Sequence, residues 1–214
     1  MAKVERAAGG SRRDPERTRA AVLGAAVEEF ARYGLGGARV DRIARRAGAN
    51  KRMLYYYFRD KENLFLAALE DRYAHIRKAE RELNLDHLDP REALARLVDF
   101  TWNYFLEHPE FMTLLNSENL HKGRHLARSR RVPDMHASLV ELLRGVLERG
   151  ERQGLFRGGV DPVQLYISIA GEGYFYLSNR YTLSRIFKCD LMTPAALARR
   201  ARHNTDMILN AVRK

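Results

Sequence analysis

Apolar residues recur every three to four positions along most of this chain, which is the spacing of amphipathic helices. Val40, Ile43, Ala44 and Ala47 make one such face over two turns. No convincing run of strict apolar–polar alternation predicts a strand, and turn signals typical of β-hairpins are few. The pattern therefore predicts an all-α protein with about nine helices.

Capping residues, glycines and prolines divide this pattern into segments. Asp14, Asp161 and Thr193 each precede a proline, which is the expected start of a helix. We interpret residues 1–15, which are small, polar and basic, as a disordered tail. The helices are expected at about 15–33, 40–47, 51–58, 61–83, 90–107, 108–121, 133–150, 162–181 and 194–212.

The second and third of these helices are short and are joined by a turn, Gly48 to Asn50. Two short helices with such a turn make a helix-turn-helix, whose second helix enters the major groove of DNA with its N-terminal residues leading. Here the leading residues are Lys51, Arg52 and Met53. The motif thus places two cations where phosphates and base edges of DNA would lie.

The charge of the chain agrees with this interpretation. Its net charge is +11, and residues 1–60 hold 14 Lys and Arg against 7 Asp and Glu. A basic end on a nearly balanced body indicates a polyanion-binding module, although an ordinary basic surface is the alternative. The single cysteine, Cys189, suits a reducing compartment. The N-terminus lacks a secretory h-region and no apolar run reaches membrane-spanning length, so a cytoplasmic protein is expected.

The segment from Val40 to Lys61 resembles the TetR family of bacterial transcriptional regulators. The shared pattern is a V-x-x-I-A helix, an A-G turn, a short helix ending in L-Y-x-x-F, and a following lysine. The matching residues are Val40, Ile43, Ala44, Ala47, Gly48, Leu54, Tyr55, Phe58 and Lys61. The resemblance implies a helix-turn-helix domain over residues 16–61, with the motif at 39–58, and a ligand-binding and dimerisation domain over 62–214.

The resemblance also implies roles for individual residues of the motif. Lys51, Arg52 and Met53 would meet base edges or phosphates, Tyr55 and Tyr57 would reach the DNA backbone, and Tyr56 would pack inside the small domain. For Tyr55 and Tyr57 core packing remains the alternative. Arg39 stands where the family often has a capping Thr or Ser, so it would replace the phosphate contact without the cap. The candidate DNA-binding residues are Arg39, Lys51, Arg52, Met53, Tyr55, Tyr57 and Lys61.

For the larger domain the resemblance implies a homodimer, an operator in double-stranded DNA and an unidentified small-molecule effector, with release of DNA as the commoner mode. An apolar pocket with a few polar groups is the expected composition of an effector site. The candidate pocket residues are Trp102, Phe105, Phe111, Met112, Leu115, Asn119, Tyr174 and Phe175. Gly171 and Gly173 weaken a helix interior, which favours close approach of another helix. The candidate dimer residues are Tyr166, Ile169, Gly171, Gly173, Tyr174, Leu177, Leu197, Ala201 and Ile208.

Other kinds of site find little support. Glu118, His121 and His125 have helical spacing for a metal, but Gly123 interrupts them and no further ligand is evident. No nucleophile elbow, Walker loop or dinucleotide fingerprint is present, so we expect neither an enzyme nor a cofactor. The basic stretch 122–131 is expected to be a solvated connection. A DNA-binding protein without a ligand, or a helical enzyme with a basic surface, are the competing functions.

Overall fold

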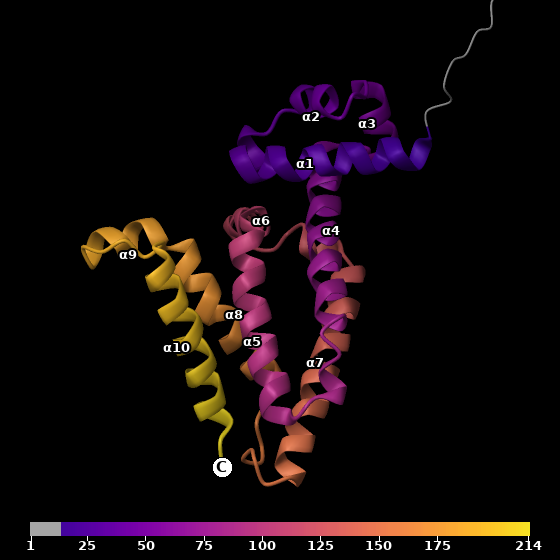
Figure 1. The fold of residues 1–214 in the computed structure, drawn as a ribbon. Coiled ribbons are helices and arrows are strands. Elements are labelled where there is room, and N and C mark those ends of the chain that lie inside the picture. Colours follow the sequence, from indigo (N-terminus) through magenta and orange to yellow (C-terminus); the bar gives the residue numbers. More distant parts are fainter. Residues whose placement is uncertain (1–13) are drawn as a thin grey trace, which may run out of the picture. The chain divides into compact units, whose positions relative to one another are not determined.

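The computed structural model describes residues 14–214 and shows an all-helical chain, which confirms the predicted fold class (Figure 1). Two residues, Phe156 and Arg213, form an isolated β-bridge, and residues 14–214 contain no longer strand. The α-helices and short 3-10 helices (η) are α1 (Pro15–Gly37), α2 (Val40–Arg46), α3 (Lys51–Phe58), α4 (Lys61–Arg81), η1 (Leu85–His87), α5 (Pro90–Glu107), α6 (Pro109–Leu120), η2 (Leu126–Arg128), α7 (Arg131–Arg152), α8 (Pro162–Ser178), α9 (Arg180–Ile186) and α10 (Pro194–Val212). The predicted tail lies almost wholly outside the described residues.

Side-chain caps explain why several helices begin where the sequence predicts. The carboxylates of Asp14, Asp89 and Asp161 accept backbone N–H groups of the first turns of α1, α5 and α8. Thr193 does the same for α10, and each of the four helices has proline in its first turn. The caps satisfy donors that a helix leaves unpaired at its N-terminus, and proline loses nothing there.

The chain forms two compact units, one ending at Ala68 and the other running from Leu69 to Lys214, so that α4 contributes to both. In the first unit, α1, α2 and α3 enclose a small core with the start of α4. Phe30 and Phe65 meet edge to face there, with ring centroids 5.1 Å apart, and Leu54 and Phe58 of α3 are buried beside them. These anchors fix α3 and leave its opposite face free.

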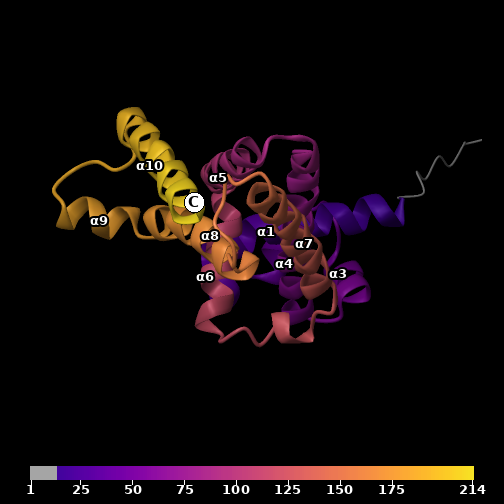
Figure 2. The same cartoon turned by 90° about the horizontal axis from the view of Figure 1, so that it is seen from below.

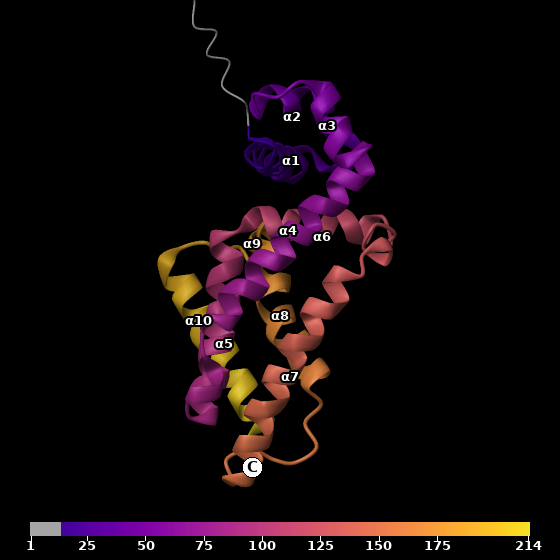
Figure 3. The same cartoon turned by 90° about the vertical axis from the view of Figure 1, so that its right-hand side faces the viewer.

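The second unit is built around α5, which packs against α7, α8 and α10 (Figures 1, 2 and 3). One apolar cluster contains residues near the end of α10, such as Val212, together with Leu94, Leu97 and Leu143. A second cluster is aromatic and includes Trp102, Phe105 and Phe111. Among residues 14–214, no helix is long and apolar enough to cross a membrane.

The structure corrects the predicted number of helices. The helix expected at 162–181 ends at Ser178, and a separate helix, α9, follows it. The amide of Asn179 donates to the carbonyl of Phe175, and the guanidinium of Arg180 donates to that of Leu177. These side chains satisfy the last carbonyls of α8, which allows the backbone to turn. α9 then projects beyond the ends of α8 and α10 (Figures 1 and 2).

Candidate nucleic-acid interface and effector cavity

The N-terminus of α3 is held by a side-chain cap. Asn50 Oδ1 accepts the backbone N–H of Met53 at 2.8 Å. Leu54 and Phe58, four residues apart, bury the inner face of the helix. Asn50, Lys51 and Arg52 are exposed, so the first turn of α3 presents backbone N–H groups and two cations to solvent. A helix N-terminus of this kind is suited to phosphate oxygens.

The helix α2 lacks a side-chain cap of its own, as the sequence predicts from Arg39, but a residue of α1 replaces the cap. Glu29 Oε1 accepts the backbone N–H of Arg39 at 3.0 Å and the Nε–H of Arg42 at 2.6 Å. Glu29 is 1% exposed. The sequence analysis missed it, and the only available signal was an acidic residue inside the apolar stripe of the first helix.

The cations of the first unit are not equally free. Lys51 Nζ lies 3.0 Å from Asp41 Oδ1, and the hydrogen bond and charge of Asp41 raise the pKa of Lys51. Arg52 is exposed, and within residues 14–214 its side chain has no ion pair or hydrogen bond. Of the two leading cations, Arg52 is therefore the one already available to a ligand. Lys51 can contact a ligand only if its ion pair with Asp41 is shared with the ligand or broken.

The three tyrosines of α3 have different surroundings. Tyr55 is 41% exposed and Tyr56 is 81% exposed, so the expectation that Tyr56 packs inside the small domain is wrong. Tyr57 is half-buried, with its ring against those of Tyr56 and Phe58. A helix of eight residues anchored by Leu54 and Phe58 can turn only one face inward, and Tyr56 lies on the other.

Two further candidate contacts lie beside the motif. Arg39 is exposed, with its backbone held by Glu29. The Lys61 ammonium donates to the carbonyl of Ala38 at 3.0 Å, at the end of α1. Met53 is half-buried. The structure thus brings Arg39, Lys51, Arg52 and Tyr55 to the surface of the first unit and gives Lys61 a structural role in joining α4 to α1.

In the second unit, six of the eight candidate pocket residues lie in the aromatic cluster. Trp102, Phe105, Phe111 and Met112 are buried, and Leu115 and Tyr174 pack against them. Asn119 and Phe175 are exposed and do not belong to this cluster. A hollow of about 380 Å³ borders Phe105 and Met112 from the side of Asn116 and Ser178. The rest of the cluster fills its own interior with ring contacts.

A different cavity, of about 380 Å³, lies between α4, η1 and α7. Its apolar wall includes Leu85, Leu139 and Leu142, and its polar wall includes Arg77 and Glu80. Both charged side chains are 2% exposed, and Arg77 Nη2 lies 2.8 Å from Glu80 Oε1. Arg77 Nη2 also donates to the hydroxyl of Tyr166 on α8 at 3.1 Å.

This ion pair leaves much of its hydrogen-bonding capacity unused. Arg77 Nε and Nη1 and both carboxylate oxygens of Glu80 have no hydrogen-bond partner among residues 14–214, since the short contact is an ion pair without hydrogen-bond geometry. Burial raises the pKa of Glu80 to about 7 against the opposing charges of Arg77 and Arg81. Buried polar atoms without partners are rare because each costs free energy, so they mark this cavity as a candidate ligand site.

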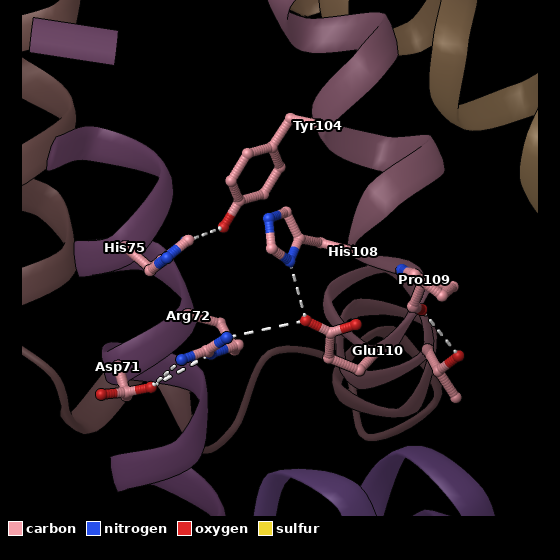
Figure 4. A network of polar contacts seen from close by, with 8 residues as sticks. Asp71, Arg72, His75, Tyr104, His108, Pro109 and Glu110 are labelled. Atoms are coloured by element: carbon pink, nitrogen blue, oxygen red, sulfur yellow. Dashed lines mark hydrogen bonds and ion pairs between the residues drawn. The ribbon is translucent and has the colours of Figure 1, made fainter. Parts of the chain in front are cut away.

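A polar network joins α4 to the corner between α5 and α6 (Figure 4). His75 Nδ1 and the hydroxyl of Tyr104 are 2.8 Å apart, and Glu110 Oε1 lies 3.2 Å from His108 Nδ1 and 3.6 Å from Arg72 Nη1. Burial lowers the pKa of His75, with smaller contributions from Arg72 and His108, so its imidazole is neutral at pH 7. The network ties α4 to Tyr104 of the aromatic cluster.

Comparisons with known proteins identify the chain. Residues 22–68 match the model of the bacterial regulatory proteins of the tetR family, and residues 90–208 match that of the tetracyclin repressor-like C-terminal domain. The chain belongs to the TetR family. It is 42% identical over 199 residues to the HTH-type transcriptional repressor NicS of Pseudomonas putida, covering 93% of this chain and 94% of that protein.

Other relatives agree with this assignment. The HTH-type transcriptional repressor SCO4008 of Streptomyces coelicolor is 37% identical over 64% of this chain and 69% of that protein. The fold matches the crystal structure of regulator SCO4942 from the same organism with a TM-score of 0.67 and 24% identity, over 91% of this chain and 98% of that one. This TetR-family chain is thus a DNA-binding transcriptional regulator with a helix-turn-helix.

The candidate dimer residues of this TetR-family chain lie mostly inside their own unit. Ile169, Leu177 and Ile208 are buried, and Leu197 and Ala201 pack against the aromatic cluster. The hydroxyl of Tyr166 accepts a hydrogen bond from Arg77. A Cβ on Gly173 would lie 3.2 Å from the Phe105 ring, whereas one on Gly171 would meet nothing within 4 Å. The close approach expected at the two glycines is therefore, at Gly173, a contact with α5 of the same chain.

The outward face of α8 was not identified from the sequence. Val163, Ile167, Gly171 and Phe175 follow one another at four-residue spacing, and all four are exposed. The three apolar side chains are 44%, 54% and 60% exposed. Their helical periodicity was a signal in the sequence, but the inward stripe of the same helix was equally apolar and concealed it.

The remaining sequence features have structural roles. Glu118 Oε1 accepts the backbone N–H groups of His125 and Leu126, and its other oxygen lies 2.6 Å from His125 Nδ1. The carboxylate therefore organises the turn between α6 and η2, and residues 14–214 hold no group of three residues suited to a metal ion. In the basic stretch, His125 and Ser129 are buried, and the Ser129 hydroxyl donates to Glu70 on α4.

Proposed function

We propose that this chain is a homodimeric transcriptional repressor that a small molecule releases from its operator. The capped N-terminus of α3, with exposed Lys51 and Arg52, carries the proposal, because that arrangement offers phosphate-binding N–H groups and base-reading cations together. Family membership supports DNA binding. The names of NicS and SCO4008 as repressors support repression rather than activation.

Each candidate DNA contact has a proposed part in this function. Arg52 contacts a base edge or a phosphate. Lys51 makes such a contact after its ion pair with Asp41 is broken. Tyr55 and Met53 flank Arg52 on its two sides around α3, while Arg39, Tyr57 and Lys61 approach the DNA backbone. Phosphate contacts position the helix, and base contacts supply the specificity.

We infer that the homodimer forms through the outward face of α8. A stripe of Val163, Ile167 and Phe175 with Gly171 in its middle is apolar enough to bury and flat enough for a second helix to approach. Two copies of α3 would then meet successive major grooves, about 34–36 Å apart. The exposed face of α10, which includes Met207, would complete the surface.

The effector cavity between α4, η1 and α7 favours this function over a constitutive DNA binder. A ligand there contacts α4, which also belongs to the DNA-binding unit, so binding to one conformation of α4 changes operator affinity by linkage. Unpartnered buried charges around a cavity cost free energy, and a ligand that pairs with them would recover it.

The first test is selection of bound sequences from random duplex DNA, followed by titration of the selected site at two salt concentrations. We expect a palindromic site with half-sites about one helical turn or a small multiple apart. Enrichment of no sequence, together with binding that vanishes steeply with salt, would show association by charge alone and contradict the proposal.

Variants of the first turn of α3 locate the interface. Lys51→Ala and Arg52→Ala should each weaken operator binding, and Arg52→Ala should also relax sequence preference if Arg52 contacts a base. Arg144→Ala is the matched control, because Arg144 is an exposed cation of α7 in the second unit. If all three variants lose the same affinity, net charge rather than α3 governs binding.

A further inference from the structure

The cavity between α4, η1 and α7 has a chemistry that restricts its ligand, provided that it is the effector site of the proposed function. Its charged groups are the pair of Arg77 and Glu80, with Arg81 and Asp86 also lining it. The pair is buried from solvent yet incompletely hydrogen-bonded. The sign of the ligand's charge therefore depends on which charged group can lie against this pair.

The two members of the pair differ in what they can do when a charged ligand arrives. Arg77 keeps its charge under physiological conditions, because guanidinium groups are not deprotonated in proteins. Glu80 can gain one, since its carboxylate lies in a low-dielectric site. An ammonium ligand would therefore lie against a cation that cannot be neutralised, whereas an anionic ligand meets a carboxylate that can be.

The unpartnered atoms also match an anion. Arg77 Nε and Nη1 offer N–H donors that nothing in residues 14–214 accepts, while Nη2 is held by Tyr166. A protonated Glu80 adds an O–H donor three residues away on the same face of α4. One oxygen of a carboxylate can accept from Arg77 and the other from Glu80.

The rest of the cavity lining determines the size and polarity of the part of the ligand that does not contact Arg77 and Glu80. Leu85, Met135, Leu139 and Leu142 supply apolar surface, and Ser138 adds one hydroxyl. A volume of about 380 Å³ lies at the lower end of ligand pockets. A phosphate or a dicarboxylate would need further donors, and the cavity lining contains no second buried cation.

We propose that this cavity binds a small monocarboxylic acid as its anion, with the carboxylate between Arg77 and a Glu80 that takes up one proton on binding. The hydrocarbon part of the ligand lies against the leucines of η1 and α7. The ligand thereby replaces an incompletely hydrogen-bonded internal ion pair with a charge-assisted hydrogen bond from Arg77 and a second one from protonated Glu80.

Because the ligand binds with uptake of a proton, its affinity should fall as the pH rises. The pKa of free Glu80 is about 7, so above pH 7 the anion must first protonate Glu80 and its affinity falls by up to about tenfold per pH unit. The other ionisable groups that line the cavity or interact electrostatically with the pair include Tyr73 and Arg81 on α4, Asp86 on η1, Tyr104 on α5, His136 on α7 and Tyr166 on α8. Burial raises the pKa of the three tyrosines and lowers that of His136, which keeps all four side chains neutral between pH 7 and pH 9.

The test uses the full chain and matched sets of probes: benzoate, benzamide and benzylamine, and octanoate, octanamide and octylamine. Thermal shift and calorimetry measure their binding. At about pH 8.5, where Glu80 of the ligand-free protein is ionised, we expect at least one carboxylate to bind with uptake of about one proton, measured in buffers of different ionisation enthalpy. The amides and amines should not bind. If no carboxylate binds, or an amide or amine of the same set binds as tightly, the proposal is wrong.

Two variants assign the binding to this pair. Glu80→Gln keeps a permanent N–H donor, so it should retain carboxylate binding while losing both the pH dependence and the proton uptake. Arg77→Met should weaken binding at least tenfold, and circular dichroism establishes that it folds. If Glu80→Gln leaves the pH dependence unchanged, Glu80 does not take up the proton and the inference fails.

Operator binding separates this inference from the function on which it rests. The same preparations are titrated with the selected DNA site in the absence of any probe. Intact operator binding with no carboxylate binding overturns the ligand class alone. Loss of sequence-specific DNA binding in the unmodified protein overturns the proposed function, whatever the probes show.

Discussion

Glu29 Oε1 accepts the backbone N–H of Arg39 at 3.0 Å, so that a carboxylate of α1 caps α2 across the turn between them. The same oxygen accepts the side chain of Arg42. Because Glu29 is 1% exposed, its charge is compensated only by these partners. The relative placement of the two helices before the recognition helix thus depends on one buried side chain that has no expected contact with DNA.

Glu29→Ala should destabilise the first unit by about 1–3 kcal/mol, because it leaves the Arg39 N–H and the Arg42 Nε–H without their acceptor and removes the ion pair with Arg42. Operator binding should weaken as well, through loss of α2 geometry. Chemical denaturation followed by far-UV circular dichroism measures the first effect and gel shift the second. Glu28→Ala is the control, since Glu28 pairs with Arg46 at the surface and should cost less than about 1 kcal/mol. Equal effects of the two variants would contradict the cap.

Asn50→Ala should cost about 1 kcal/mol of stability, because Asn50 is the side-chain cap of α3. The helix has only eight residues, so fraying of its first turn also displaces Lys51 and Arg52 and lowers operator affinity. Asn50→Ser retains a capping oxygen and should preserve most of the affinity. If alanine and serine behave alike, the amide of Asn50 acts through something other than the cap.

The stability of the second unit should depend on pH through Glu80. Its pKa is raised from 4.5 in the unfolded chain to about 7 in the folded one, so its contribution is fully favourable below pH 4.5 and is lost as pH rises through 7. The unfolding free energy of the native protein should therefore fall, relative to that of Glu80→Gln, between pH 5 and pH 7.5. Denaturant titrations of both proteins across this range measure it, and a constant difference would show that Glu80 is not perturbed.

Phe175→Glu should dissociate the proposed homodimer without unfolding the chain, because Phe175 is 60% exposed on the outward face of α8. Burial of a carboxylate in an apolar interface is strongly unfavourable. Analytical ultracentrifugation gives the mass, and circular dichroism gives the helix content. Leu120→Glu is the control, since Leu120 is an exposed apolar residue of α6. A dimeric Phe175→Glu protein would place the interface elsewhere.

The sequence by itself determined the helices and the DNA-binding motif, because these depend on local physics. Periodicity marked the apolar faces. Asp14, Asn50 and Asp161 were predicted as N-caps, and in the structure each caps the N-terminus of its helix. The motif residues from Val40 to Lys61 are close in the chain, so their spacing alone resembled a family that the comparisons then confirmed.

Only the tertiary structure decided which of several equivalent apolar or charged residues meet across the fold. The family resemblance placed Tyr56 in a core that Leu54 and Phe58 already fill, and periodicity could not distinguish the inward stripe of α8 from its outward one. Periodicity gave no reason to join Glu29 to Arg39, or Arg77 to Tyr166, which are 89 residues apart. Such contacts depend on how the helices pack. The free energy of a polar contact also depends on its burial, and these groups become buried only when the chain has folded.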